Sequence, residues 1–488
     1  MLTTLFLSLL ACGALYYIGS AIYSITLHPL ASIPGPLVCK ITRIPYWYVS
    51  ISGVDVPWMK TLHDKYGPVV RFGPTDLSYA SAEGWQDVHG PKVQEKALEF
   101  FPRPVNDTPP MLTQTHEVHT RVRRVFSPAF STRSLKAQEP LFLKYAGHLT
   151  SKVSEVGRDG KEPIDIGALL NFTTFDVMAE LTFGHNLGML AKSKNDPWVE
   201  SIVGWLKMLP LVAMINYYPI LRVTVFDKLQ PKWVSKQREK HCAFAEELVN
   251  KRLEKGSTKP DVWKFVLDDK GQGLALPEMH SNAEAFMLAG SETTATLLSG
   301  AIFYLLKSPQ TLNTLVEEIR SSFKSQEDLT LENLGSLKYM TACIKEALRV
   351  YPPVPIGSPR NVQKGGQMIL GKWVPEETRV SVHHWSTYHS EANFTEPDSF
   401  IPERWLGTDP KFANDNFAAH QPFGYGYRNC IGQNMAMHEM RLLLASILLK
   451  YDLDLCEESK NWADQKSFAL WIKPKLMVRA VPRVSEKN

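Results

Sequence analysis

The sequence predicts a mainly α-helical protein with a minor β part (α+β), folded as one large domain behind an N-terminal apolar segment. Helical periodicity dominates from about 115 to 350. Residues 352–400 are rich in Pro, Gly and β-branched residues, which indicates small strands and turns. No linker divides residues 37–488, so we expect one domain, although a length of 488 residues would by itself suggest roughly three.

The helical part follows from apolar residues that recur at helical spacing. Pro277 suits the first turn of the longest helix, and Pro309 ends its pattern. Earlier in the chain, residues 67–81 alternate like two short strands joined by a Gly-Pro turn, so the β part is split between N-terminal and C-terminal regions. The expected helices cover 116–127, 139–156, 165–183, 235–255, 277–307, 309–323, 339–350 and 433–450.

Composition excludes several classes of protein. Hydrophobic residues make up 44% of the chain and charged residues 21%, which is typical of globular proteins and not of disordered, collagen-like or coiled-coil ones. The net charge of +4 is too small to indicate a nucleic-acid partner. The six cysteines form no C-x-x-C pair, which argues against a disulfide scaffold or a zinc knuckle.

The N-terminal segment lacks charge, because residues 2–27 contain no Asp, Glu, Lys or Arg. As a helix it would extend about 39 Å, enough for a tilted crossing of a bilayer core about 30 Å thick. A cleaved signal peptide would need a basic start and a shorter apolar run. We therefore expect a transmembrane anchor at 1–27, a proline-rich hinge at 28–36 and one large domain at 37–488.

Two further features bear on the membrane. The first positive charges after the anchor, Lys40 and Arg43, predict a cytoplasmic domain by the positive-inside rule. A second apolar stretch, 211–221, is too short to span a bilayer and is interrupted by Pro219. This stretch is expected to be either a core loop or a membrane-dipping loop beside a substrate entrance.

The strongest chemical signal is the run 423–432 (FGYGYRNCIG), directly before the expected helix 433–450. A thiolate ligand needs a low pKa, and a helix start offers Cys430 a positive dipole end and free N–H groups. Arg428 adds positive charge two residues away, and Phe423 would shield the sulfur from water. The loop therefore suits a cysteinate that faces a metal or an electrophile, the alternative being a structural cysteine in a turn.

A second signal, AGSETT at 289–294, lies midway in the expected helix 277–307. Gly290 would open room for a ligand over the helix. The Thr293 hydroxyl could bond to a bound group, and Glu292 could supply it with protons through water. The alternative is a threonine that bonds back to a carbonyl of its own helix, and the residues alone favour neither.

A third pattern is the i,i+3 pair Glu346 and Arg349, which is ordinarily a solvated pair on a helix surface. The run 402–405 (PERW) follows later in the chain. A buried cluster of Glu346, Arg349 and Arg404 would pin that loop near Cys430.

Fourth, His119 and Arg123 lie four residues apart and share one helix face, which could clamp an anionic group. The alternative is a basic surface for a phosphate, a membrane or an acidic partner.

Together and in order, these motifs resemble those of a membrane-anchored cytochrome P450, a haem-thiolate monooxygenase, along almost the whole chain. The Cys430 loop is similar to the haem-binding signature of that family, although Tyr427 stands where the family often has Pro. Residues 289–294 are similar to its oxygen-activating helix motif. The first 150 residues look like those of filamentous-fungal enzymes that tailor secondary metabolites.

The resemblance implies the cytochrome P450 fold and haem b with an axial cysteine thiolate. Cys430 would be the iron ligand, and its charge would favour O–O cleavage. Thr293 and Glu292 would manage the protons. The residues that would contact the cofactor beside Cys430 are His119, Arg123, Arg360, Arg428, Phe423 and Gly290.

The implied reaction uses O2 and NADPH-derived electrons to hydroxylate or epoxidise an apolar small molecule, such as a polyketide, terpenoid or alkaloid. The expected electron donor is NADPH-cytochrome P450 reductase, with cytochrome b5 as a second candidate. The implied location is the endoplasmic reticulum membrane, single-pass, with the catalytic domain facing the cytoplasm and lipid as a further partner. The alternatives are a haem-thiolate isomerase or dehydratase that uses no O2, and a non-catalytic membrane haem protein. The pair Glu292–Thr293 favours the monooxygenase.

Overall fold

The structure, a computed structural model, describes residues 2–90, 94–101, 107–218, 232–254, 261–267 and 273–483. The described chain is mainly helical with small sheets, so the predicted fold class is confirmed. The helices are α1 Leu2–Thr26, α2 Leu37–Ile41, α3 Ile44–Ser52, α4 Asp55–Tyr66, α5 Ala82–His89, α6 His116–Phe126, α7 Thr132–Gly157, α8 Ile166–Phe183, α9 Met189–Lys192, α10 Pro197–Leu206, α11 Leu209–Tyr217, α14 Lys232–Glu254, α15 Val262–Leu267, α16 Leu276–Lys307, α17 Pro309–Ser322, α18 Leu331–Ser336, α19 Lys338–Val350, α20 His384–Tyr388 and α21 Gln433–Lys450. The strands are β1 Val69–Gly73, β2 Asp76–Tyr79, β3 Glu95–Lys96, β4 Ile164–Asp165, β5 Arg360–Asn361, β6 Gln367–Ile369, β7 Lys372–Val374, β8 Arg379–Val382, β9 Tyr451–Leu455, β10 Lys466–Phe468, β11 Leu470–Ile472 and β12 Met477–Pro482.

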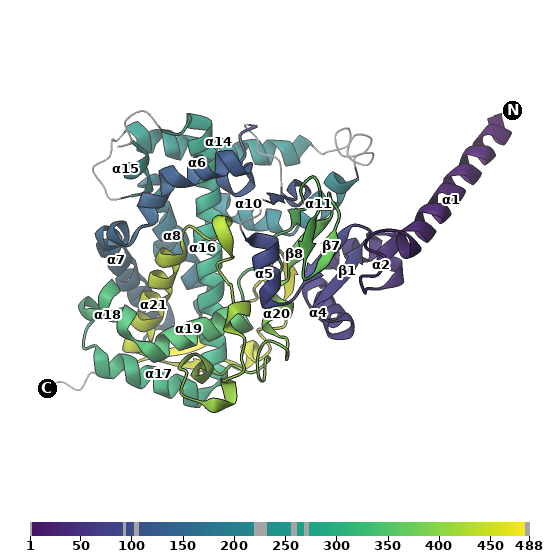
Figure 1. Cartoon of the computed structure of the whole chain (residues 1–488). Helices are drawn as coiled ribbons and strands as arrows, with labels where there is room; N and C mark the ends of the chain where they lie inside the picture. Colours follow the sequence, from purple (N-terminus) through teal and green to yellow (C-terminus); the bar gives the residue numbers. More distant parts are fainter. Residues whose placement is uncertain are drawn as a thin grey trace.

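The long helix α16 runs through the middle of the helical part, with α8 and α21 beside it (Figure 1). It begins with Pro277 in its first turn and ends before Pro309, as the sequence predicts. Its apolar residues face neighbours on every side, which is why its second half is buried almost completely. The main hydrophobic core therefore forms around α16, together with α7, α8, α19 and α21.

A small mixed sheet joins N-terminal and C-terminal segments, in the order β1-β2-β8-β5-β3. Strands β2 and β8 pair in parallel, with Leu77 opposite Val380, and the other pairs are antiparallel. Leu77, Val380 and Val382 belong to a second core cluster with Trp85 of α5. The sheet brings residues 95–96 next to 360–361 and so connects two distant parts of the chain at the site described below.

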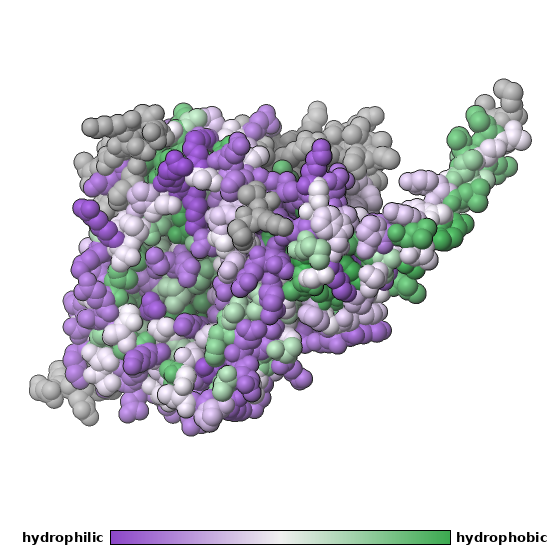
Figure 2. Space-filling model, viewed as in Figure 1, coloured by the Kyte–Doolittle hydropathy of each residue, from purple (hydrophilic) through white to green (hydrophobic). Residues whose placement is uncertain are grey.

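The N-terminal helix α1 projects away from the main body and is exposed along most of its length (Figure 1). Figure 2 shows apolar residues along it. Residues Thr3–Thr26 are long and apolar enough to cross a membrane by length and composition, which agrees with the expected anchor. The hinge is fixed to the sheet, because Arg71 of β1 donates to the Ser24 and Leu30 carbonyls at 2.8 and 3.2 Å.

Candidate active site

The Cys430 loop is a tight turn that leads directly into α21. The Cys430 N–H donates to the Phe423 carbonyl at 2.7 Å, which closes the loop. Gly426 has a φ of 74°, and a side chain there would collide with the carbonyl oxygen of His89. Cys430 keeps accessible surface although protein surrounds it on most sides, a combination expected of a side chain that faces an internal space.

The charge beside the thiol comes from a different arginine than the one predicted. Burial raises the pKa of Cys430, while the Gly432 N–H and the Arg123 guanidinium lower it. Arg428 instead turns away and bonds to Glu95 and to the Gln114 carbonyl, both at 2.8 Å. The expectation that Arg428 lowers the thiol pKa is therefore wrong, and Arg123 has that role.

Arg123 also fixes the loop through two hydrogen bonds to Asn429. Its Nη1 and Nη2 donate to the carbonyl and side-chain oxygens of Asn429 at 2.5 and 2.7 Å. Tyr427 packs edge-on against His119, with ring centroids 6.1 Å apart, and its hydroxyl donates to the Gln94 carbonyl at 3.1 Å. The tyrosine that departs from the family pattern therefore packs against His119.

A cluster of buried basic side chains lies beside the loop, formed by Lys96, His119, Arg360 and Arg428. Burial and the neighbouring arginines lower the pKa of Lys96 well below its ordinary value and that of Arg360 to about 10. Burial, followed by Arg428, lowers the pKa of His119 to about 4, so this imidazole is neutral at neutral pH. Glu95 balances Arg428, but further positive charge in a protein interior remains costly.

Several donors of this cluster have no acceptor within the described part of the chain, namely Arg428 Nε and Nη1, Arg360 Nη1 and the ring atom His119 Nδ1. Buried polar groups are normally hydrogen-bonded, so these donors indicate a ligand rich in anionic oxygens. The two propionates of a haem fit this requirement. Lys96 was missed by sequence reasoning, because it belongs to no recognisable motif and reaches the cluster only through β3–β5 pairing.

In α16 the predicted glycine has a packing role. A side chain at Gly290 would lie 2.7 Å from Met178 Sδ, so the glycine permits close contact between α16 and α8. The expectation that Gly290 opens room for a ligand is not met, since its missing side chain points at α8. The Thr293 hydroxyl donates to the Ala289 carbonyl at 2.6 Å, and Glu292 bonds to Lys473. The helix-internal bond is thus the one present for Thr293.

The predicted ion cluster is present and fully buried. Glu346 accepts from Arg349 Nη2 at 2.7 Å and from Arg404 Nε at 3.1 Å, and all three side chains are 0% exposed. Arg349 also donates to the carbonyls of Tyr388 and Ser399, at 2.9 and 2.7 Å. The cluster therefore fixes the segment that precedes the Cys430 loop, as the sequence predicts.

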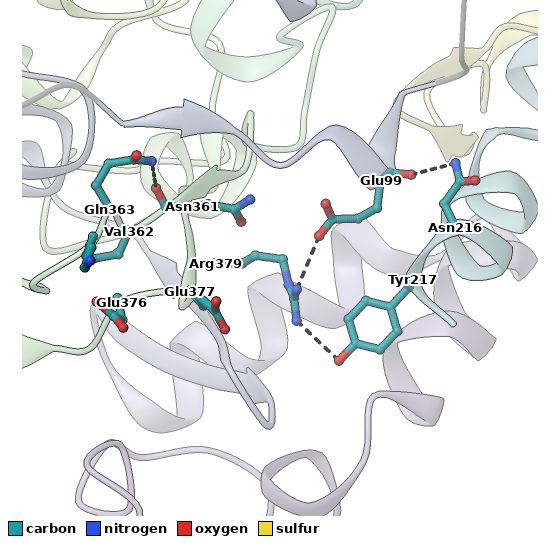
Figure 3. A pocket seen from close by; sticks show the side chains of 10 residues that line it. Glu99, Asn216, Tyr217, Asn361, Val362, Gln363, Glu376, Glu377 and Arg379 are labelled. Atoms are coloured by element: carbon teal, nitrogen blue, oxygen red, sulfur yellow. Dashed lines mark hydrogen bonds and ion pairs between the residues drawn. The ribbon is translucent and has the colours of Figure 1, made fainter. Parts of the chain in front are cut away.

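Two other predicted features are the apolar stretch 211–221, which lies apart from the cysteine loop, and Phe423, which belongs to it. The stretch 211–221 was expected as a loop, but residues 209–217 form the helix α11, and residues 219–221 lie outside the described part. Tyr217 of α11 accepts from Arg379 at 3.2 Å beside a polar cavity of about 800 Å³ (Figure 3). Phe423 packs against the main core, which fits its predicted shielding role.

A cysteine at a helix start, accessible yet largely surrounded by protein and close to buried basic side chains, is the arrangement expected of a haem-thiolate protein. The chain matches the family described as Cytochrome P450 over residues 55–479 and belongs to that family, as its motifs predict. Proteins of this family bind haem through a cysteine thiolate.

Relatives of similar length cover nearly the whole chain. It is 44% identical to "Cytochrome P450 monooxygenase efuB" of Hormonema carpetanum over 95% of this chain and 94% of the relative. It is also 44% identical to "Cytochrome P450 monooxygenase FUM2" of Gibberella moniliformis (94% and 98%) and 39% identical to "Averantin hydroxylase" of Dothistroma septosporum (97% and 91%). The predicted enzyme class, a monooxygenase, is confirmed.

Proposed function

We propose that this enzyme uses O2 and NADPH-derived electrons to hydroxylate or epoxidise an apolar small molecule in a fungal secondary-metabolite pathway. The main support is the cluster of buried basic side chains beside Cys430. Several hydrogen-bond donors of this cluster have no acceptor in the described part of the chain, and the propionates of haem b would supply one. The fungal relatives, one of them named a hydroxylase, support the kind of reaction.

In this proposal Cys430 ligates the iron, and the haem supplies O2 activation and electron transfer when it is bound. His119, Arg360, Arg428 and Lys96 would hold the propionates, while Arg123 steadies the loop through Asn429 and could also reach a propionate. Thr293 would exchange its bond to the Ala289 carbonyl for one to a distal group and hold a proton at Oγ1. Glu292 would supply protons to Thr293.

We further propose that the chain is anchored by residues 1–27 in the endoplasmic reticulum membrane, followed by the hinge at 28–36. The domain 37–488 would face the cytoplasm, where a reductase supplies electrons. Arg121 and Arg124 of α6 are basic residues on which an acidic face of a reductase could dock. Arg121 forms an ion pair with Glu278, and Arg124 is exposed, so Arg124 is the better candidate.

Spectroscopy and turnover test the proposal. The reduced protein is expected to show the CO spectrum of a thiolate-ligated haem, and Cys430→Ala is expected to lose it. Product should require NADPH, reductase and O2, and Thr293→Ala should form less product per NADPH consumed. A thiolate spectrum in Cys430→Ala would refute the ligand assignment. Turnover by the wild type without O2 would instead favour the isomerase or dehydratase.

A further inference from the structure

Glu292 forms an ion pair with Lys473, a lysine that belongs to none of the sequence motifs described above. Lys473, which follows β11, donates from Nζ to Glu292 Oε1 and to Thr296 Oγ1, the latter at 2.6 Å. The Glu292 side chain is 5% exposed and that of Lys473 is 13% exposed. The carboxylate is therefore the buried end of this ion pair, and the ammonium is the end closer to solvent.

The backbone around Lys473 is fixed on both sides. Trp471 Nε1 donates to the Pro352 carbonyl at 2.8 Å, and Trp462 Nε1 donates to the Pro474 carbonyl at 2.9 Å. The ring of Trp471 also stacks on Tyr351, with centroids 5.4 Å apart. The fold thus delivers the ammonium to Glu292 at little further cost in side-chain entropy.

Proton donation by a buried carboxyl group produces a buried carboxylate. Such a charge is strongly disfavoured unless a countercharge and hydrogen bonds stabilise it. Lys473 provides that countercharge, and Thr296, one helical turn from Glu292, shares the ammonium. Without Lys473, the carboxylate that forms at Glu292 would be buried without this countercharge, which would disfavour proton donation.

We propose that Lys473 is a positioning residue that allows Glu292 to deliver protons beside Thr293, an inference that rests on the proposed function. In each delivery Thr293 Oγ1 gives its own proton to the distal group and takes one from the Glu292 carboxyl, which becomes a carboxylate paired with Lys473. Lys473 Nζ then gives a proton to this carboxylate and takes one from solvent, which restores both groups. The charge of the site is unchanged over the cycle.

The test compares Lys473→Met with Lys473→Arg, Glu292→Gln and the double variant, each loaded with haem and reconstituted with reductase. Lys475→Met is the matched control, because Lys475 is exposed and lies two residues further on. The measured quantities are product formed and hydrogen peroxide released per NADPH oxidised. Lys473→Met is expected to lower the product ratio about fivefold and raise peroxide, as expected for loss of a proton-delivery group. Lys473→Arg should restore most of the ratio, and Lys475→Met should leave it unchanged.

The double variant distinguishes positioning from a general structural effect. In the Glu292→Gln background, Lys473→Met should have no further effect on the product ratio. An equal fall in both backgrounds, or no fall in either, would overturn the proposal. If the wild type lacks a thiolate CO spectrum, the proposed function fails instead.

Urea unfolding gives a readout independent of turnover. The unfolding midpoint should fall in Lys473→Met, because Glu292 is left buried without its partner, and should recover in part in the double variant. No recovery would show that the two side chains are not coupled in the folded protein, which would also overturn the proposal.

Discussion

Replacing Glu346 by Gln should destabilise the protein more than any exposed charge change. The Glu346 carboxylate accepts five hydrogen bonds and is 0% exposed. The donors are Arg349 Nε at 2.9 Å, Arg349 Nη2 at 2.7 Å, Ile401 N at 2.9 Å, Arg404 Nε at 3.1 Å and Trp405 Nε1 at 2.8 Å. Gln keeps the volume of the side chain but removes the charge that two buried guanidinium groups share.

The magnitude follows from the burial. Removing one partner of a buried ion pair costs about 3–5 kcal/mol, since the remaining charge stays desolvated. Unfolding entropy is about 2.1 cal/mol/K per residue, so for roughly 450 residues it is about 1 kcal/mol/K. The midpoint of thermal unfolding should therefore fall by about 3–5 °C. Haem should also be lost faster, because Arg349 pins the segment that precedes the Cys430 loop.

The assay is thermal unfolding of the haem-loaded protein at one scan rate, followed by circular dichroism and haem absorbance. The matched control is Glu396→Gln, which breaks the ion pair with Lys411 at 2.6 Å, where both side chains are about half exposed. Such a pair contributes about 0–1 kcal/mol, so the control should shift by about 1 °C or less. Equal shifts in the two variants would refute the reasoning that burial sets the cost.

Three further predictions concern the site. Lys96→Met should speed haem loss to an excess haem scavenger about tenfold. It should also stabilise the haem-free protein, because it removes a buried basic group. Lys372 is exposed, so the control Lys372→Met should change neither quantity. Gly290→Ala should cost about 1–3 kcal/mol of unfolding free energy by overpacking, and less in a Met178→Val background, as urea unfolding would show. The pKa of His119 falls from 6.5 to about 4 on folding, so the stability that this residue contributes is complete above pH 6.5 and is lost as the pH falls towards 4. The urea midpoint of His119→Gln should therefore fall less steeply over this pH range than that of the wild type. An unchanged slope would contradict this prediction.

The parts of the fold that sequence predicted well have strong local signals. The helix predicted at 277–307 is Leu276–Lys307, since its apolar pattern is long and prolines mark both ends. The helix predicted at 139–156 begins at Thr132 instead. Its N-terminal cap is Ser131, whose hydroxyl accepts from the Ser134 N–H, and Pro140 lies within the helix. The expected start at 139 therefore misses the first seven residues of the helix, which precede a proline of a kind that is uncommon in helix interiors.

The candidate site shows the same division between local and distant information. Glu346, Arg349 and Arg404 were predictable because they belong to motifs with fixed spacing. The hydrogen-bond partner of Arg428 was not predictable, because Glu95 lies 333 residues away in the sequence. Spacing along the chain indicates which residues share a turn or a helix face, but not which distant strand reaches them.

Lys96 and Lys473 extend this argument, because burial distinguishes them and sequence does not. Their side-chain partners, Ser358 and Glu292, lie 262 and 181 residues away. A buried ammonium must have a counter-anion, or it loses its charge. Lys473 has such an anion in Glu292, whereas Lys96 lies beside Arg360 and Arg428 and, among the described residues, donates a hydrogen bond to the neutral hydroxyl of Ser358. The same physical requirement therefore indicates opposite roles. Lys473 is satisfied by the carboxylate of Glu292, whereas Lys96 requires a ligand at the cysteine loop.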